Sequence, residues 1–127
     1  MTRIKTALTI FIAFLFLIST AKAQSPPSLP ASFYGSLTIN NQPAPIGIVI
    51  IAKIDNEDRG SITTNQAGSY GGPNGIDTKL IVTGSGQDEG KKITFFINEK
   101  EADQSAIWHS GDVLKLDLSV QGLIIVQ

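Results

Sequence analysis

The residue types that could carry a reaction stand close together near the end of the chain. His109, the only histidine, is followed at once by Ser110 and three positions later by Asp112. A serine hydrolase needs a nucleophilic serine, a histidine base and an orienting acid. These three residue types are all present, so a small secreted hydrolase is an alternative function. Adjacent residues on a strand point to opposite faces, however, so Ser110 is badly placed to partner His109. We therefore expect a histidine at a strand end, and no catalytic site.

Two acidic turns, "DNED" (55–58) and "QDEG" (87–90), could offer oxygen ligands to calcium. Calcium takes clustered oxygens, but neither turn has the spacing of an EF-hand. Zinc needs about four nitrogen or sulfur ligands, which one histidine and no cysteine cannot supply. We favour solvated turns that keep the strand edges soluble, with calcium as the alternative, and assign no metal and no cofactor.

Exposed aromatic rings offer a second kind of site. Carbohydrate sites on β-sandwiches stack such rings on the apolar face of a sugar, beside amides and carboxylates. The candidate stacking aromatics are Tyr34, Tyr70 and Phe96. Phe96 follows Phe95 on one strand and should face outward, whereas Trp108 is expected in the core. A carbohydrate-binding module is therefore an alternative function.

The elements that must position these residues are short strands separated by turns. The last of them, 112–120, alternates most regularly, with the leucines at 114, 116 and 118 on one face. The charged segment 99–104 is expected to be a connection. Short strands with turns at regular spacing are typical of a sandwich, so we expect an all-β, seven-stranded antiparallel Greek-key β-sandwich, Ig-like or prealbumin-like. The expected strands are 33–39, 47–54, 61–65, 77–84, 91–98, 105–109 and 112–120.

The chain begins with the layout of a secretory signal peptide. Arg3 and Lys5 precede an apolar run over 7–18, and Ala21-Lys22-Ala23 follows as an A-x-A cleavage site. As a helix this run is too short for a hydrocarbon core of about 30 Å. We expect a signal-peptide helix over 1–23 with cleavage after Ala23, a Pro/Ser linker over 24–32, a β-sandwich domain over 33–120 and an apolar C-terminal tail over 121–127.

The net charge and the cysteine content limit the classes of partner and the means of stabilisation that we expect. Without segment 1–23 the chain keeps seven basic and eleven acidic side chains, a formal net charge of −4. Binding to nucleic acid requires a basic face, and binding to an anionic membrane requires a basic patch, so neither partner is expected. The chain has no cysteine, so the exported domain relies on packing rather than disulfides. We expect a secreted or cell-surface protein with no stable membrane span after cleavage.

Three pieces resemble, in order, a known kind of module. They are "FYGSLTINNQPAPIGIVIIAKI", "GSITTNQAGSYG" and "KKITFFINEKEADQSAIWHSGDVLKLDLSV". They are similar to the carboxypeptidase regulatory-like (transthyretin-like) β-sandwich modules of exported archaeal and bacterial surface proteins, whose signature T-x-x-x-G-x-Y is matched by Thr64, Gly68 and Tyr70. The resemblance spans Phe33–Val120 and implies a structural, adhesive or spacer role without catalysis.

The strand "GIVIIAKI" (47–54) is apolar at nearly every position. If its even-numbered residues face the core, Val49 and Ile51 point outward, near Phe96. Apolar outer patches of this kind mark interaction surfaces. We therefore predict an exported, non-enzymatic module with a structural, adhesive or protein-binding role. Its partner would be a protein or glycan of the cell envelope or exterior, with self-association through this face or the apolar tail as a further alternative.

Overall fold

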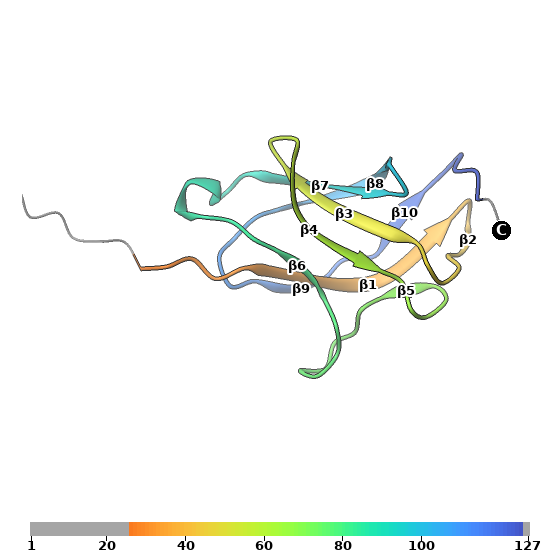
Figure 1. The fold of residues 1–127 in the computed structure, drawn as a ribbon, viewed down its shortest axis with the longest axis horizontal. Helices are drawn as coiled ribbons and strands as arrows, with labels where there is room; N and C mark the ends of the chain where they lie inside the picture. The colour runs from red at the N-terminus through yellow and green to blue at the C-terminus, as the bar shows by residue number, and fades with distance from the viewer. Residues whose placement is uncertain (1–25, 126–127) are drawn as a thin grey trace, which may run out of the picture.

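The computed structural model describes residues 26–125 as an all-β domain of two facing sheets (Figure 1). One sheet has the order β4-β3-β7-β8. The other is built around β1, which pairs with β2, β5, β6, β9 and β10. The predicted all-β class is thereby confirmed, whereas the predicted signal peptide lies outside the described residues. The strands are β1 Ala31–Ile39, β2 Gln42–Pro43, β3 Val49–Ile54, β4 Glu57–Thr63, β5 Ser69–Tyr70, β6 Leu80–Val82, β7 Lys92–Ile97, β8 Lys100–Ile107, β9 Val113–Lys115 and β10 Leu118–Val120, with one 3-10 helix, η1, at Gly86–Asp88.

The strand pairs are antiparallel with two exceptions. β1 runs parallel to β9 and to β10, which follow each other along the same side of it. The sandwich is held at one side by a hydrogen bond of 3.0 Å from the Thr83 amide to the Arg59 carbonyl. At the other side the Ser119 amide donates to the Gln104 side chain at 2.8 Å. Residues 26–125 form the ten strands β1–β10, so the predicted seven strands and their Greek-key order are not confirmed.

The core lies between the two sheets, where the alternating apolar residues meet. Phe33 of β1 and Phe95 of β7 contact edge to face, with ring centroids 5.5 Å apart. Trp108 is fully buried, as predicted, and its indole N–H donates to the Val82 carbonyl at 3.0 Å. A Cβ on Gly84 would lie 2.5 Å from the Trp108 ring, so only glycine fits there. Burial of these rings supplies much of the stabilisation of a domain without disulfides.

The predicted strand 112–120 is interrupted at Leu116 and Asp117. A Cβ on Gly35 of β1 would lie 2.4 Å from the Leu116 carbonyl oxygen, so the chains approach closely here. The Leu116 amide still donates to the Tyr34 carbonyl at 2.8 Å, but side chains replace the rest of the backbone ladder here. The Ser36 amide donates to Asp117 Oδ1 at 2.9 Å, and the Tyr70 hydroxyl donates to the Leu116 carbonyl. Leu114 lies on the same side of the sheet as its buried partner Phe33, but it is 44% exposed because β9 is an edge strand.

Three two-residue turns have positive φ at both positions, as a type I′ hairpin requires. They are Asn40–Asn41, Asp55–Asn56 and Asn98–Glu99. The tight turn at 98–99 makes segment 100–107 strand β8, so the predicted charged connection over 99–104 is wrong. β8 is an edge strand whose first part exposes the charged Lys100, Glu101 and Asp103, which hinder unwanted pairing, while Ala102 faces the core.

Both ends of the described chain are held to the domain. β1 begins at Ala31, which is buried, two residues before the predicted boundary at 33. At the other end the Asn40 side chain accepts a hydrogen bond of 2.7 Å from the Gly122 amide and donates one of 2.8 Å to the Leu123 carbonyl. Leu123 and Ile125 pack against the core, whereas Ile124 is 87% exposed. Residues 121–125 thus fold back on their own domain.

Candidate functional site

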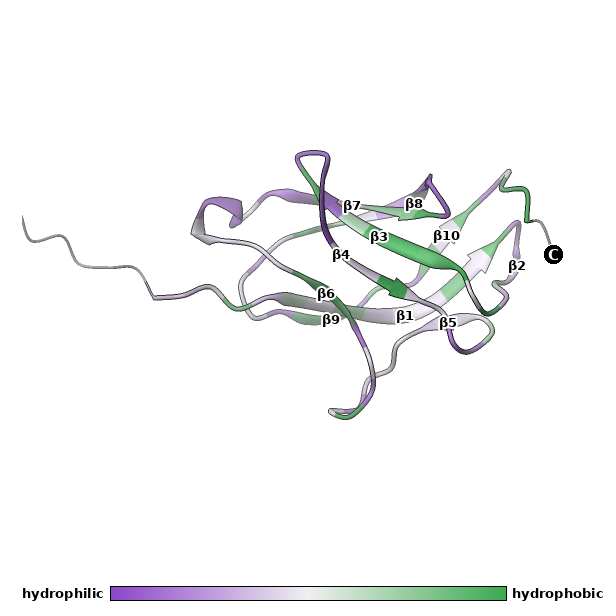
Figure 2. Ribbon diagram, in the orientation of Figure 1, coloured by the Kyte–Doolittle hydropathy of each residue, from purple (hydrophilic) through white to green (hydrophobic). Residues whose placement is uncertain are grey.

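The outer face of β3 and β7 carries the predicted apolar patch. Ile51 of β3 and Phe96 of β7 are direct cross-strand partners, and both are half-buried. Val49 is 38% exposed at the start of β3. The structure thus brings Ile51 and Phe96 together where the alternation of the sequence put them, with Val49 two residues along β3 on the same face. β3 is coloured apolar over most of its length in Figure 2.

A cation covers the aromatic end of this face. Lys53 Nζ lies 4.8 Å from the centroid of the Phe96 ring and 3.6 Å from the Asp58 carboxylate. A cation over a ring is attracted by its negative face. The Phe96 ring is therefore already engaged by Lys53 and offers less free face to a sugar than we expected.

The other end of the face is a hollow of about 400 Å³ lined by Val49, Ile51, Asn98 and Glu99. The Asn98 side chain accepts a hydrogen bond of 3.1 Å from the Val49 amide, and the Asn98 amide donates one of 3.0 Å to the Val49 carbonyl. Glu99 is exposed and forms no ion pair with another described residue. We call Val49, Ile51, Phe96, Asn98 and Glu99 the β3–β7 face.

Tyr70 is not a stacking aromatic, so this part of the predicted carbohydrate site is wrong. Its side chain is 0% exposed and its hydroxyl donates to the Leu116 carbonyl. Burial raises the pKa of the Tyr70 hydroxyl well above its usual range. The ring fills the core end beside the break between β9 and β10, where it supports the fold.

Tyr34, in contrast, is half-buried on the outer face of the second sheet. Lys79 Nζ lies 5.8 Å from the centroid of its ring. A cavity of about 420 Å³ opens beside it, and the lining residues are Tyr34, Gly35, Ser36, Ser69, Gly71, Gly72, Pro73, Lys115 and Asp117. Of the three predicted stacking aromatics, Tyr34 is the one that borders a cavity and is also accessible.

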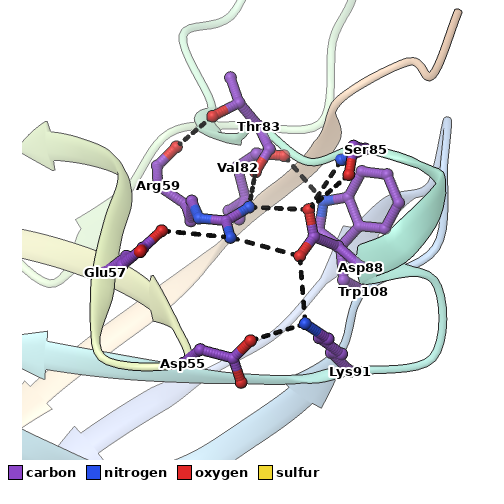
Figure 3. Close-up of polar contacts among 9 residues, drawn as sticks. All are labelled: Asp55, Glu57, Arg59, Val82, Thr83, Ser85, Asp88, Lys91 and Trp108. Atoms are coloured by element: carbon purple, nitrogen blue, oxygen red, sulfur yellow. Dashed lines mark hydrogen bonds and ion pairs between the residues drawn. The ribbon is translucent and has the colours of Figure 1, made fainter.

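The two acidic turns come together in space, joined by basic side chains (Figure 3). Arg59 donates to both carboxylate oxygens of Asp88, at 2.8 and 3.2 Å. Lys91 lies 2.6 Å from the Asp55 carboxylate and 3.7 Å from that of Asp88. Arg59 also lies 3.5 Å from Glu57. The two turns therefore form an ion-pair network between β4 and the segment that leads into β7.

This network explains why Asp88 is buried while charged. The Arg59 guanidinium, with a 2.8 Å hydrogen bond from the Ser85 amide, holds the pKa of Asp88 far below its usual range. Arg59 and Lys91 thus neutralise carboxylates of the two turns that we considered as alternative calcium ligands. Within residues 26–125 there is no cluster of three or more His, Cys, Asp or Glu side chains that could hold a metal ion.

His109 has an acidic partner that sequence spacing did not indicate. Its Nδ1 is hydrogen-bonded to Glu89, twenty residues upstream, and this contact raises the pKa of His109. The other Glu89 oxygen accepts a hydrogen bond of 3.1 Å from the Ser110 amide. The Ser110 hydroxyl accepts one of 2.9 Å from the Leu29 amide. The contacts of this cluster therefore tie the segment before β1 to the loop before β9.

Asp112, the nearest acid in the sequence, forms a hydrogen bond with His109 only through the backbone, its amide donating to the His109 carbonyl at 3.3 Å. No hydrogen bond joins the Ser110 hydroxyl to the His109 ring among the described contacts. The side-chain contact with Glu89 could not have been predicted from the sequence, since it requires knowing that the turn 87–90 returns beside the strand end. The geometry is that of a surface ion pair with structural hydrogen bonds around it.

No protein-family model, curated protein or solved structure matches this chain. Among residues 26–125 there is also no helix with the length and apolar character needed to cross a membrane.

Proposed function

We propose that this chain is an exported, non-enzymatic β-sandwich module that acts by binding another protein at or outside the cell surface. The observation that carries the proposal is the β3–β7 face, where Val49 and Ile51 border a hollow next to an exposed acid. Surface apolar residues scattered singly need no explanation, but a contiguous patch with polar groups at its rim is typical of a binding site.

The chemistry of the hollow suggests what it would accept. Val49 and Ile51 give it aliphatic walls, which favour an aliphatic side chain of the partner. Glu99 lines the same hollow and pairs with no cation among residues 26–125, so a lysine or arginine of the partner beside that side chain would complete the contact. The proposed partner is therefore a protein surface with an aliphatic residue next to a basic one.

Two further arguments support the class of protein. The first is the layout of segment 1–23, which is that of a cleaved signal and favours export. The second is the resemblance of Phe33–Val120 to carboxypeptidase regulatory-like modules, which serve as structural or adhesive parts of surface proteins. We also propose the finer topology of such modules: β9 and β10 count as one interrupted strand, the two-residue β2 and β5 are accessory, and the remaining seven strands follow a Greek-key order.

The proposal is tested with the purified protein and cell-envelope proteins. We expect the wild-type chain to retain a defined envelope protein, and Ile51→Ser to weaken its capture about tenfold, the effect of one buried aliphatic anchor. Ile81→Ser is the matched control, because Ile81 is 44% exposed on the opposite sheet. A protein that stays monomeric in light scattering and captures no envelope component contradicts the proposal, as does equal capture by the two variants.

A further inference from the structure

The cavity beside Tyr34 lies on the sheet opposite the β3–β7 face and has a different chemistry. It opens over the point where β1 passes from β9 to β10, and residues of β1, β5, the loop after β5 and segment 115–117 line it. Its volume of about 420 Å³ lies in the range of small-ligand sites. The ring of Tyr34 and the ring of Pro73 give it flat apolar walls.

The polar groups of this cavity have hydrogen-bonding capacity left over. Asp117 Oδ1 accepts the Ser36 amide at 2.9 Å, while Oδ2 takes part in no hydrogen bond among the described residues. The Ser36 amide holds the pKa of Asp117 below its usual value, so the carboxylate stays an acceptor. Lys115, also in the lining, is exposed and forms no ion pair with a described residue. The cavity therefore offers one strong acceptor and one strong donor close to an aromatic ring.

Two glycines in the loop after β5, Gly71 and Gly72, belong to the lining of the cavity. Gly71 has φ +69°, and a Cβ there would lie 2.4 Å from the Thr78 carbonyl oxygen. A Cβ on Gly72 would lie 2.5 Å from the Asp77 carboxylate. Both positions therefore need glycine for close packing within their own loop, and this packing fixes the part of the cavity lining that Gly71 and Gly72 form.

We propose that this cavity binds a neutral hexose unit of a glycan. A pyranose ring has an apolar face that stacks on an aromatic ring. The Tyr34 ring is less closely covered than that of Phe96, because Lys79 Nζ lies 5.8 Å from its centroid whereas Lys53 Nζ lies 4.8 Å from that of Phe96. Its hydroxyls both donate and accept, which matches a carboxylate and an ammonium in one site. One positive and one negative group leave the lining without the excess of cations that a phosphate or polyanionic ligand needs. The Tyr34 site is independent of the β3–β7 face, so the module would hold a glycan on one sheet and a protein on the other.

The first test is a titration of the isotope-labelled protein with glucose, galactose, mannose and N-acetylglucosamine at millimolar concentration, followed by amide NMR. We expect saturable shifts from at least one sugar, confined to Gly35, Ser36, Gly71 and Gly72. Sugars that shift no amide, or that shift those of β3 and β7 instead, overturn the proposal.

The second test uses variants with the sugar that binds. Tyr34→Ala should weaken binding roughly tenfold, whereas Tyr34→Phe, which keeps the ring, should bind as wild type. Lys115→Met should also weaken binding, because it removes the donor and keeps the stem. Ile107→Ala is the control, because Ile107 is 45% exposed on β8 of the opposite sheet and lies in neither proposed site, and it should leave the affinity unchanged. If Tyr34→Ala is folded by its amide spectrum and binds as wild type, the proposal is wrong.

Discussion

The Arg59 guanidinium of β4 forms two hydrogen bonds, of 2.8 and 3.2 Å, with the Asp88 carboxylate, whose side chain is 6% exposed. The two residues are 29 positions apart in the chain. Between them they join the edge strand of one sheet to the segment that crosses over from β6 to β7. A buried pair of this kind adds little net stability when it forms, but leaves an uncompensated charge when one partner is removed.

Asp88→Asn should therefore lower the free energy of unfolding by about 3 kcal/mol, because Arg59 keeps its charge and loses its acceptor. The same change at Asp58, which lies 3.6 Å from Lys53 and is 65% exposed, should cost less than about 1 kcal/mol. Urea unfolding of both variants measures the two values. Equal losses at the two positions would show that Asp88 behaves as a surface residue.

The stability that Asp88 contributes should depend on pH. Its pKa is lowered in the folded protein, so the unfolded chain binds the proton more readily at low pH. The contribution is complete above the unfolded pKa of about 4 and is lost as the pH falls below it. The difference in unfolding free energy between wild type and Asp88→Asn should thus be constant from neutral pH down to about pH 4 and shrink below. A difference that grows on acidification contradicts this assignment.

Tyr70→Phe tests the break between β9 and β10. The variant keeps the buried ring but removes the hydroxyl that donates to the Leu116 carbonyl. We expect a loss of about 1–2 kcal/mol in unfolding free energy, since a buried acceptor is left without its partner. Tyr34→Phe is the control, because Tyr34 is half-buried and its hydroxyl makes no described hydrogen bond. A Tyr70→Phe variant as stable as Tyr34→Phe would mean that the hydroxyl does not support this corner.

Glu99→Gly should stabilise the domain by about 1 kcal/mol. Glu99 is held at φ 74° in the turn between β7 and β8, a conformation that disfavours a side chain and suits glycine. The resulting Asn-Gly pair is the preferred one for this hairpin. Glu101→Gly, two residues on within β8, should instead destabilise by roughly 0.5–1 kcal/mol, because glycine weakens a strand. Thermal unfolding of the two variants shows whether their shifts have opposite sign.

The elements with clean alternation were predictable because each has one face in the core. Ile50, Ala52 and Ile54 on β3, and Ile93, Phe95 and Ile97 on β7, are all fully buried, as period-two alternation requires. The outward positions of Ile51 and Phe96 follow from the same rule. The predicted strand 105–109 overlaps the end of β8, but its charged first part, 100–104, was wrongly predicted as a connection. An edge strand needs few apolar residues, so its charges resemble those of a loop.

The contacts that hold the candidate sites together could not be predicted, because they join segments far apart in the chain. Glu89 reaches His109 across 20 residues, and Asp117 accepts the Ser36 amide across 81. Nothing local marks these partners. The break at Leu116 depends on the close approach of Gly35, which the even alternation of 112–120 conceals. The Tyr34 cavity lies beside this break, so it could not be predicted from the sequence either.

We propose above all that the β3–β7 face is a protein-binding surface. The most direct test is calorimetry, which measures the affinity of the wild type and its variants for the envelope protein that the wild type retains. Ile51→Ser and Glu99→Asn should each weaken binding about tenfold or more, the first by removing an apolar wall and the second by removing the charge while keeping the turn. Ile81→Ser should bind as wild type. Unchanged affinity for both Ile51→Ser and Glu99→Asn, with the variants folded, would contradict the claim.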